Sequence, residues 1–273
     1  MLASLLLSLR EGLEAALIIG ILFGALRKIQ RPALRSTVWA GTLSAALLSL
    51  LAAVGLNAVG ASFTGTGEQI FEGVTMLLAA SVLTWMIFWM ARQSRSLKHE
   101  LEADVRRAAA QAGRLPLFSL AFLAVIREGI ELALFLTAAT LAADARQTLT
   151  GALLGLGLAI VLGWGLFRAT IHLNLQKFFQ ITGMLLLVFA AGLVAHGVHE
   201  FNELGWIPAL IEHVWDINPF LNEKSILGEI LKALFGYNGN PSLTEVIAYL
   251  GYFGAIALGL RWQKASLPAV GPA

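Results

Sequence analysis

Residues 7–20 read LSLREGLEAALIIG, which places an arginine and two glutamates inside a long apolar stretch. Residues 124–137 read AVIREGIELALFLT and repeat the pattern, with Arg127 following Arg10 by 117 positions. A charged side chain at the centre of a membrane span costs roughly 2.5–3.5 kcal/mol, whereas an apolar residue contributes only about 0.3–0.6 kcal/mol. Because the chain carries this penalty twice, we expect the charges to serve its function.

The composition around these two segments indicates a membrane protein. Of 273 residues, 58% are hydrophobic and only 13% are charged, and the mean hydropathy is +0.76. These values exclude a disordered chain, a nucleic-acid-binding protein and an ordinary soluble enzyme. The absence of cysteine excludes disulfides, thiolate metal sites and cysteine nucleophiles.

Apolar segments long enough to cross a bilayer recur along the whole chain. We predict an all-α integral membrane protein with seven transmembrane helices, at 3–26, 37–58, 69–91, 117–142, 148–168, 178–199 and 243–262. On this topology fourteen lysines and arginines fall on one side of the membrane and three on the other. The positive-inside rule then predicts a multi-pass protein of the cytoplasmic (inner) membrane, with its N-terminus outside and its C-terminus in the cytoplasm.

The duplicated motif predicts an internal repeat. Three spans separate its two copies, so the copies run in opposite directions, and the architecture is two inverted three-helix repeats plus a seventh helix. Transporters commonly use inverted repeats and bind their substrate where the repeats meet. The predicted division is a core at 1–199 (repeat one 1–91, a cytoplasmic loop with a solvated helix 92–115, repeat two 116–199), an extracytoplasmic loop with an amphipathic helix at 200–242, and a seventh helix with a cytoplasmic tail at 243–273.

Helical spacing gives the motif residues distinct roles. Two carboxylates share a face in each copy, and each arginine lies four residues before the second glutamate, which it can brace. The glycines remove bulk beside the carboxylates, and small residues continue along the first span to permit close helix approach. If the copies face each other, four carboxylates and two guanidiniums carry a formal charge of −2 and suit a hard cation. The predicted metal ligands are Glu11, Glu14, Glu128 and Glu131, supported by Arg10, Arg127, Gly12 and Gly129.

A second group of polar residues clusters near the outer ends of the third and sixth spans. These residues could form an outer acidic site that receives an ion before it reaches the motif. They are Glu68, Glu72, His196, His199, Glu200 and Glu203. The structural alternative is that these are ordinary charges at helix ends, and that the motif itself forms buried ion pairs that only fix helix packing.

The two pentapeptides resemble the paired Arg-Glu-x-x-Glu motifs of the oxidase-dependent iron permeases, which include fungal high-affinity iron permeases and bacterial inner-membrane relatives. The runs FEGVTMLL at 71–78 and HEFNELG at 199–205 are similar to that family as well. The resemblance covers essentially the whole chain. It implies import of iron, as Fe²⁺ or Fe³⁺, with the motif glutamates coordinating the ion during passage and no permanently bound cofactor.

The resemblance also implies a separate periplasmic oxidase, peroxidase or iron-delivery protein, because the chain carries no redox site of its own. It leaves open whether the chain works alone or as a homo-oligomer in the lipid bilayer. Two alternatives to iron import remain open. One is a transporter of another divalent cation, and the other is an intramembrane glutamate- or metal-dependent hydrolase. The duplication disfavours the hydrolase, because an acid–base pair needs two unlike residues.

Overall fold

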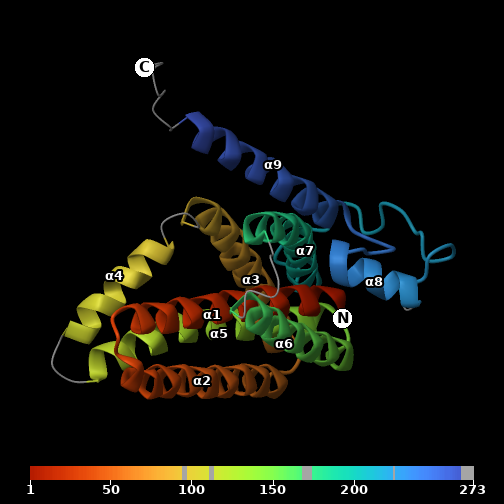
Figure 1. Cartoon of the computed structure of the whole chain (residues 1–273). Helices are drawn as coiled ribbons and strands as arrows, with labels where there is room; N and C mark the ends of the chain where they lie inside the picture. Colours follow the sequence, from red (N-terminus) through yellow and green to blue (C-terminus); the bar gives the residue numbers. More distant parts are fainter. Residues whose placement is uncertain (94–96, 111–113, 168–173, 224, 266–273) are drawn as a thin grey trace.

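The computed structural model describes residues 1–93, 97–110, 114–167, 174–223 and 225–265, and within these ranges the chain is all-helical (Figure 1). The helices are α1 (Leu2–Lys28), α2 (Arg35–Ser62), α3 (Thr66–Gln93), α4 (Leu97–Ala110), α5 (Leu115–Ala142), α6 (Ala145–Phe167), α7 (Leu175–Glu203), α8 (Ile226–Phe235) and α9 (Leu243–Ala265). A single 3₁₀ turn, Pro32–Leu34, precedes α2.

Five segments of the described chain are long and apolar enough to cross a membrane: Pro32–Ser62, Thr66–Met90, Ala145–Phe167, Leu175–Glu203 and Leu243–Arg261. The all-helical, multi-pass fold expected from the sequence is therefore confirmed at this level. Helices α1 and α5 have the required length, at 27 and 28 residues, but each carries the three charges of the motif. Their assignment as spans remains a prediction.

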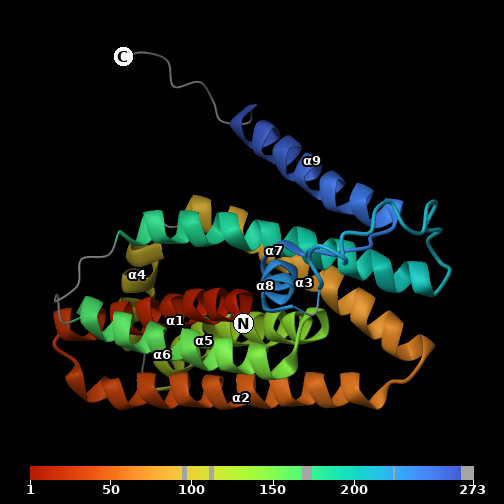
Figure 2. The ribbon, with the colours of Figure 1, turned by 90° about the vertical axis from the view of Figure 1, so that its right-hand side faces the viewer.

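Helices α1 and α5 lie side by side at the centre of the bundle and run in opposite directions (Figure 1). Figure 2 shows α2 and α6 on the outside of this pair. The closest helix pairs are α1 with α6, α2 with α5, and α3 with α7. The outward faces of α2 and α6 expose leucines such as Leu43, Leu51, Leu149 and Leu153, as expected of surfaces that contact lipid.

The motif glycines bring each central helix close to one outer helix. A Cβ atom added at Gly12 would lie 2.7 Å from the Cβ of Ala159 on α6, and one added at Gly129 would collide with Ser49 on α2. The row of small residues on α1 therefore packs against α6 rather than against the other motif. Gly24 does not take part, since nothing lies within 4 Å of an added Cβ there.

Helix α4 differs from the solvated helix expected in the loop after the third span. Its residues Leu101, Val105 and Ala108 recur at helical spacing and are buried, and they pack with Leu22 and Leu117 at one end of the central helix pair. The charged residues of α4 cover its opposite face. The helix is therefore an amphipathic cover over the end of the bundle where α1 stops and α5 begins.

The amphipathic helix expected within 200–242 is α8. The hydroxyl of Ser225 caps its start by accepting a hydrogen bond from the Gly228 amide at 3.0 Å, and Gly236 ends it in the left-handed conformation with φ 65°. Gly236 also lies directly against Gly192 of α7. Helix α8 contacts α1, α5 and α7 at the end of the bundle opposite α4.

Candidate ion site

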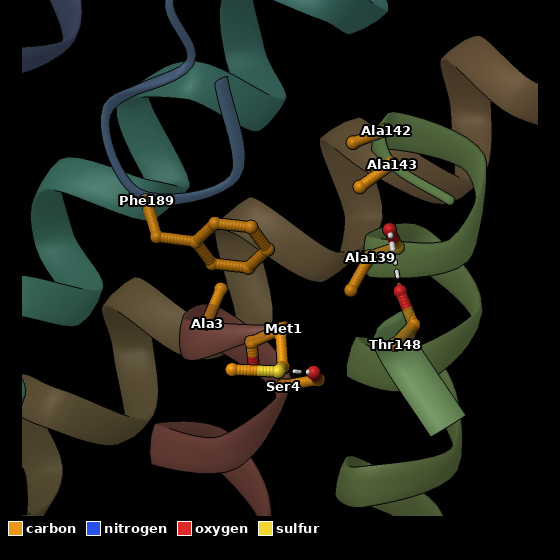
Figure 3. A pocket seen from close by; sticks show the side chains of 8 residues that line it. All are labelled: Met1, Ala3, Ser4, Ala139, Ala142, Ala143, Thr148 and Phe189. Carbon is orange, nitrogen blue, oxygen red and sulfur yellow. Dashed lines mark hydrogen bonds between the residues drawn. The ribbon is translucent and has the colours of Figure 1, made fainter. Parts of the chain in front are cut away.

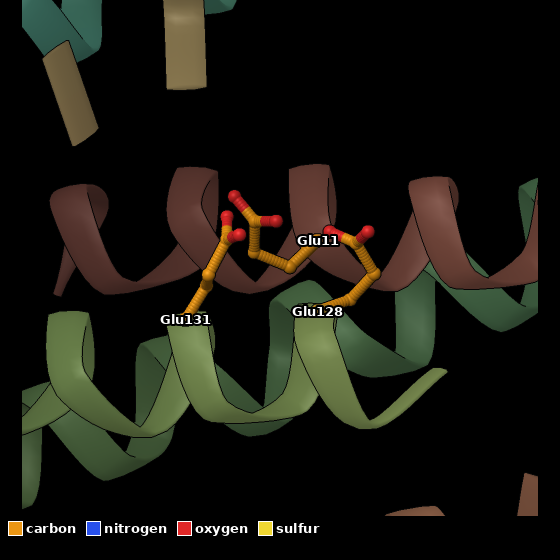
Figure 4. A group of neighbouring side chains, drawn as sticks. All are labelled: Glu11, Glu128 and Glu131. Carbon is orange, nitrogen blue, oxygen red and sulfur yellow. The ribbon is translucent and has the colours of Figure 1, made fainter. Parts of the chain in front are cut away.

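Three carboxylates of the duplicated motif converge between the two central helices. Glu11 of α1 and Glu128 and Glu131 of α5 each offer one oxygen, and these atoms all lie within 4.8 Å of one another. Figure 4 shows the α5 side chains pointing toward α1 and meeting Glu11 there. This group, the carboxylate triad, is the one set of at least three potential metal ligands found this close together within the described ranges. Glu14 does not belong to it.

Each arginine pairs with the second glutamate of its own motif. Nη2 of Arg10 lies 3.2 Å from Oε1 of Glu14, and Nε of Arg127 donates to Oε1 of Glu131 at 2.9 Å. Arg10 lies farther from Glu11, at 3.7 Å, and also donates to the sulfur of Met86 at 3.5 Å. The bracing that the four-residue spacing predicts is therefore present in both copies.

The triad is buried, and several of its oxygens lack a protein partner. The three glutamates are 1%, 5% and 8% exposed. Both oxygens of Glu11 and the Oε2 atoms of Glu128 and Glu131 make no hydrogen bond to the described part of the protein. An uncompensated buried carboxylate costs several kcal/mol, and opposite charge in the same place offsets that cost. Orphaned carboxylate oxygens that point at one another suit a hard cation.

The packing between the triad and the nearer end of the bundle is tight. Figure 3 shows a cavity among the start of α1, the end of α5, the start of α6 and Phe189 of α7. Its volume is about 10 Å³, enough for about one water molecule. Ser4 at its wall lies seven residues before Glu11, which is roughly 10 Å along a helix. Glu11, Glu128 and Glu131 are not among the residues that line this cavity.

The outer acidic site joins α3 and α7 but does not converge on one point. Glu68, Glu72, Glu200 and Glu203 interact electrostatically across the two helices, and Gln69 donates to Oε2 of Glu203 at 2.7 Å. Glu68 and Glu203 are exposed, whereas Glu72 and Glu200 are half-buried. The arrangement is an acidic surface rather than a compact metal cage.

The two histidines of this site have different surroundings. Nδ1 of His199 lies 3.0 Å from Oε1 of Glu245 on α9, and its Nε2 lies 3.4 Å from Oε1 of Glu203. Nδ1 of His196 instead lies 2.9 Å from the carbonyl oxygen of Gly192, within its own helix. His196 is therefore tied to helix backbone, and His199 links two carboxylates.

Glu245 was not among the residues singled out from the sequence. It is 4% exposed, and its Oε1 accepts a hydrogen bond from the Ser242 amide at 3.2 Å while its own amide donates to the Ser242 hydroxyl at 3.3 Å. Asn238 donates to its other oxygen at 2.7 Å. The spacing Ser-x-x-Glu before an apolar run is the signature of a helix capping box, and it could have identified this residue.

Comparison with known proteins identifies the family. The model of the iron permease FTR1 family matches residues 1–268. The chain is 37% identical over 249 residues to proteins named ferrous iron permease EfeU from Escherichia coli strains, such as O6:K15:H31 and O157:H7, covering 90% of both chains. It is 36% identical over 250 residues to the protein of that name from Yersinia pestis, covering 90% of this chain and 88% of the relative.

No solved structure matches this chain. The family is one of transporters, which disfavours the hydrolase alternative. The sequence match spans both copies of the motif and every helix described above, so the chain belongs to the iron permease FTR1 family.

Proposed function

We propose that this chain imports iron across the cytoplasmic membrane and holds the ion, in passage, on the carboxylate triad. The observation that carries the proposal is the convergence of three buried carboxylates from the two motif copies within 4.8 Å. Oxygen ligands suit both Fe²⁺ and Fe³⁺. The relatives are named for ferrous iron, which favours Fe²⁺ as the ion that permeates.

The role of Glu14 in this proposal follows from its position outside the triad. Glu14 pairs with Arg10 and lies one helical turn from Glu11 on α1, so it is the natural next ligand when the ion leaves Glu11. The two arginines limit the negative charge around the ion. An ion that binds only to unbalanced carboxylates would be held too tightly to be released, and the guanidiniums weaken that attraction.

The architecture proposed for this function is seven spans built as two inverted repeats, α1–α3 and α5–α7, with α9 as the seventh span. It is supported by helix packing in which the first helix of each triplet contacts the second helix of the other. The equivalent glycines, Gly12 and Gly129, make these two contacts. The excess of basic residues at the α4 end supports a cytoplasmic position for that end and an outside position for the N-terminus.

Transport in this scheme requires the helices to move, because apolar packing closes the triad on both sides. Toward the cytoplasm, Leu101 and Val105 of α4 pack in one apolar cluster with Leu22 and Leu26 of α1. Toward the outside, Leu7 and Phe135 are fully buried in a cluster with α3 and α7. The proposed state is occluded, and the two apolar clusters open alternately.

The outer acidic site would raise the local concentration of iron before it enters. Four glutamates on α3 and α7 create a negative potential that attracts cations. Oxidation or delivery of iron would fall to a periplasmic partner, as the family resemblance implies. Transport of another divalent cation is the competing function, because hard oxygen ligands accept several such ions.

The test is uptake of radiolabelled iron by cells that lack other iron importers, with Fe²⁺ and Fe³⁺ offered separately. We expect Glu11→Gln and Glu128→Gln to abolish uptake at matched membrane levels. Glu212→Gln, in the exposed loop after α7, is the matched control and should behave as wild type. Full uptake by both motif variants would refute the ion site, and a preference for Mn²⁺ over iron in competition would favour the other cation.

A further inference from the structure

The two arginines of the duplicated motif occupy unlike environments. The side chain of Arg10 is 1% exposed and lies wholly among protein groups. The side chain of Arg127 is 34% exposed, although the helix that carries it is central to the bundle. An inverted repeat alone would give both arginines the same surroundings, so the difference needs a cause outside the motif.

Arg127 lies at the edge of the lipid-facing surface of α5. Leu123 and Ile130, four residues before it and three after it, share its side of the helix, and they are 64% and 51% exposed. A guanidinium on such a surface meets hydrocarbon unless other side chains cover it.

Two tryptophans of α3 supply that cover. The guanidinium carbon of Arg127 lies 4.2 Å from the ring centroid of Trp89 and 5.9 Å from that of Trp85. The two rings, one helical turn apart, stack with centroids 6.3 Å apart. A cation within about 6 Å of an indole face is attracted by the ring, and the attraction is strongest where water is excluded. The aromatic residues at this end of α3 thus contact the motif.

We propose that Trp89 is a positioning residue that acts on the ion through Arg127; this inference rests on the triad being the iron site. The ring holds the guanidinium where Nε bonds Oε1 of Glu131 at 2.9 Å, which leaves Oε2 of Glu131 without a protein partner and available to a metal. Trp85 extends the same surface at longer range. Arg10 needs no such holder, because protein surrounds it completely.

Without the ring, the guanidinium would become a competitor for the ion site. Arginine has five N–H donors, and the carboxylates that interact electrostatically with Arg127 include Glu128 and Glu131, each of which has an orphaned Oε2. A guanidinium that turns into the triad must be displaced each time a metal binds. We therefore expect Trp89→Leu to weaken iron binding about tenfold, which corresponds to about 1.4 kcal/mol.

The experiment measures the dissociation constant of Fe²⁺ by equilibrium binding of radiolabelled iron to the full chain in lipid nanodiscs, without oxygen. Trp89→Phe keeps an aromatic face and should stay within about threefold of wild type, since a phenyl ring also attracts a cation. Trp39→Leu is the matched control, because Trp39 is a half-exposed tryptophan of α2 that packs on Phe23, away from the motif. If Trp89→Leu does not reach the membrane, Trp89→Met replaces it.

A double-mutant cycle separates positioning from packing. We expect Trp89→Leu to weaken binding tenfold in the wild-type background and by less than twofold in the Arg127→Gln background, because the competing cation is then absent. The same loss in both backgrounds, or no loss in either, would overturn the inference.

Glu131→Gln in the same assay tests the underlying site. If Glu131→Gln binds iron as wild type does, the proposed ion site fails and the inference fails with it. If Glu131→Gln loses binding while Trp89→Leu is neutral, only the role of Trp89 fails.

Discussion

Neutralising Glu11 should have opposite effects on ion binding and on the stability of the metal-free protein. Glu11 is 1% exposed and neither of its oxygens has a hydrogen-bond partner, so its charge is buried without full compensation. Glu11→Gln removes that charge and preserves the shape of the side chain. The metal-free variant should therefore be at least as stable as the wild type, since truncating an uncompensated charge removes its desolvation cost.

The magnitude of the binding loss follows from the geometry of the triad. Two unit charges about 4 Å apart interact by about 4 kcal/mol at an effective dielectric constant near 20. The amide of Glu11→Gln keeps one oxygen as a ligand, so only part of this interaction is lost. We take about 2.8 kcal/mol, or a hundredfold in affinity, as the lower bound on the loss of iron binding. At an iron concentration 100 times the wild-type dissociation constant, binding stabilises the wild type by about 2.7 kcal/mol and the variant by only about 0.4 kcal/mol.

The assay is thermal unfolding of the purified protein in detergent, with and without Fe²⁺. The expected result is an iron-dependent rise in melting temperature that Glu11→Gln loses while its metal-free melting temperature is unchanged or higher. A purely structural ion pair predicts the reverse, because breaking a buried pair destabilises by about 3–5 kcal/mol. A metal-free variant that is destabilised by that amount, yet keeps the iron-dependent rise, would refute the reasoning.

Three further predictions concern helix packing, the α4 cover and the outer acidic site. Gly129→Leu should destabilise the protein by about 1–3 kcal/mol through its collision with α2. Gly24→Ala has room within α1 and should leave the stability unchanged or raise it by up to about 1 kcal/mol in the same thermal unfolding assay. Lys28→Glu should speed iron release in stopped-flow flux by no more than about threefold, because it breaks a 3.2 Å ion pair in which the lysine is 64% exposed and leaves Glu102 paired with Arg106 at 3.4 Å. A release rate at or below that of the wild type would argue against α4 as a cover. Glu72→Gln should raise the iron concentration for half-maximal uptake and leave the maximal rate unchanged, an effect that should shrink as salt is added; a fall in the maximal rate instead would place Glu72 on the path itself.

The sequence was sufficient for the features that depend on local spacing. The four-residue interval predicts the pairing of Arg10 with Glu14, and the repeat 117 positions later predicts that Arg127 pairs with Glu131; both contacts are present. Ser225 and Gly236 sit at the ends of the amphipathic helix that the apolar spacing within 200–242 predicts.

Features that depend on how the helices pack against one another could not be predicted from the sequence. The two pentapeptides do not indicate that Glu14 lies outside the carboxylate triad, because its position depends on the rotation of α1 relative to α5. In the same way, the sequence does not indicate which helix packs against the row of small residues on α1, because that depends on the position of α6. Leu101 and Val105 recur at helical spacing in the sequence, but the many charged residues around them favour a solvated helix. In the structure both side chains are buried.

The central claim is that iron rests between Glu11, Glu128 and Glu131. The most direct measurement is an anomalous difference map at the iron absorption edge from crystals of the protein soaked anaerobically with Fe²⁺. The account predicts a peak among the three carboxylates in the wild type and its loss in Glu128→Gln. A peak that lies instead beside His199 at the outer acidic site, and that persists in Glu128→Gln, would contradict it.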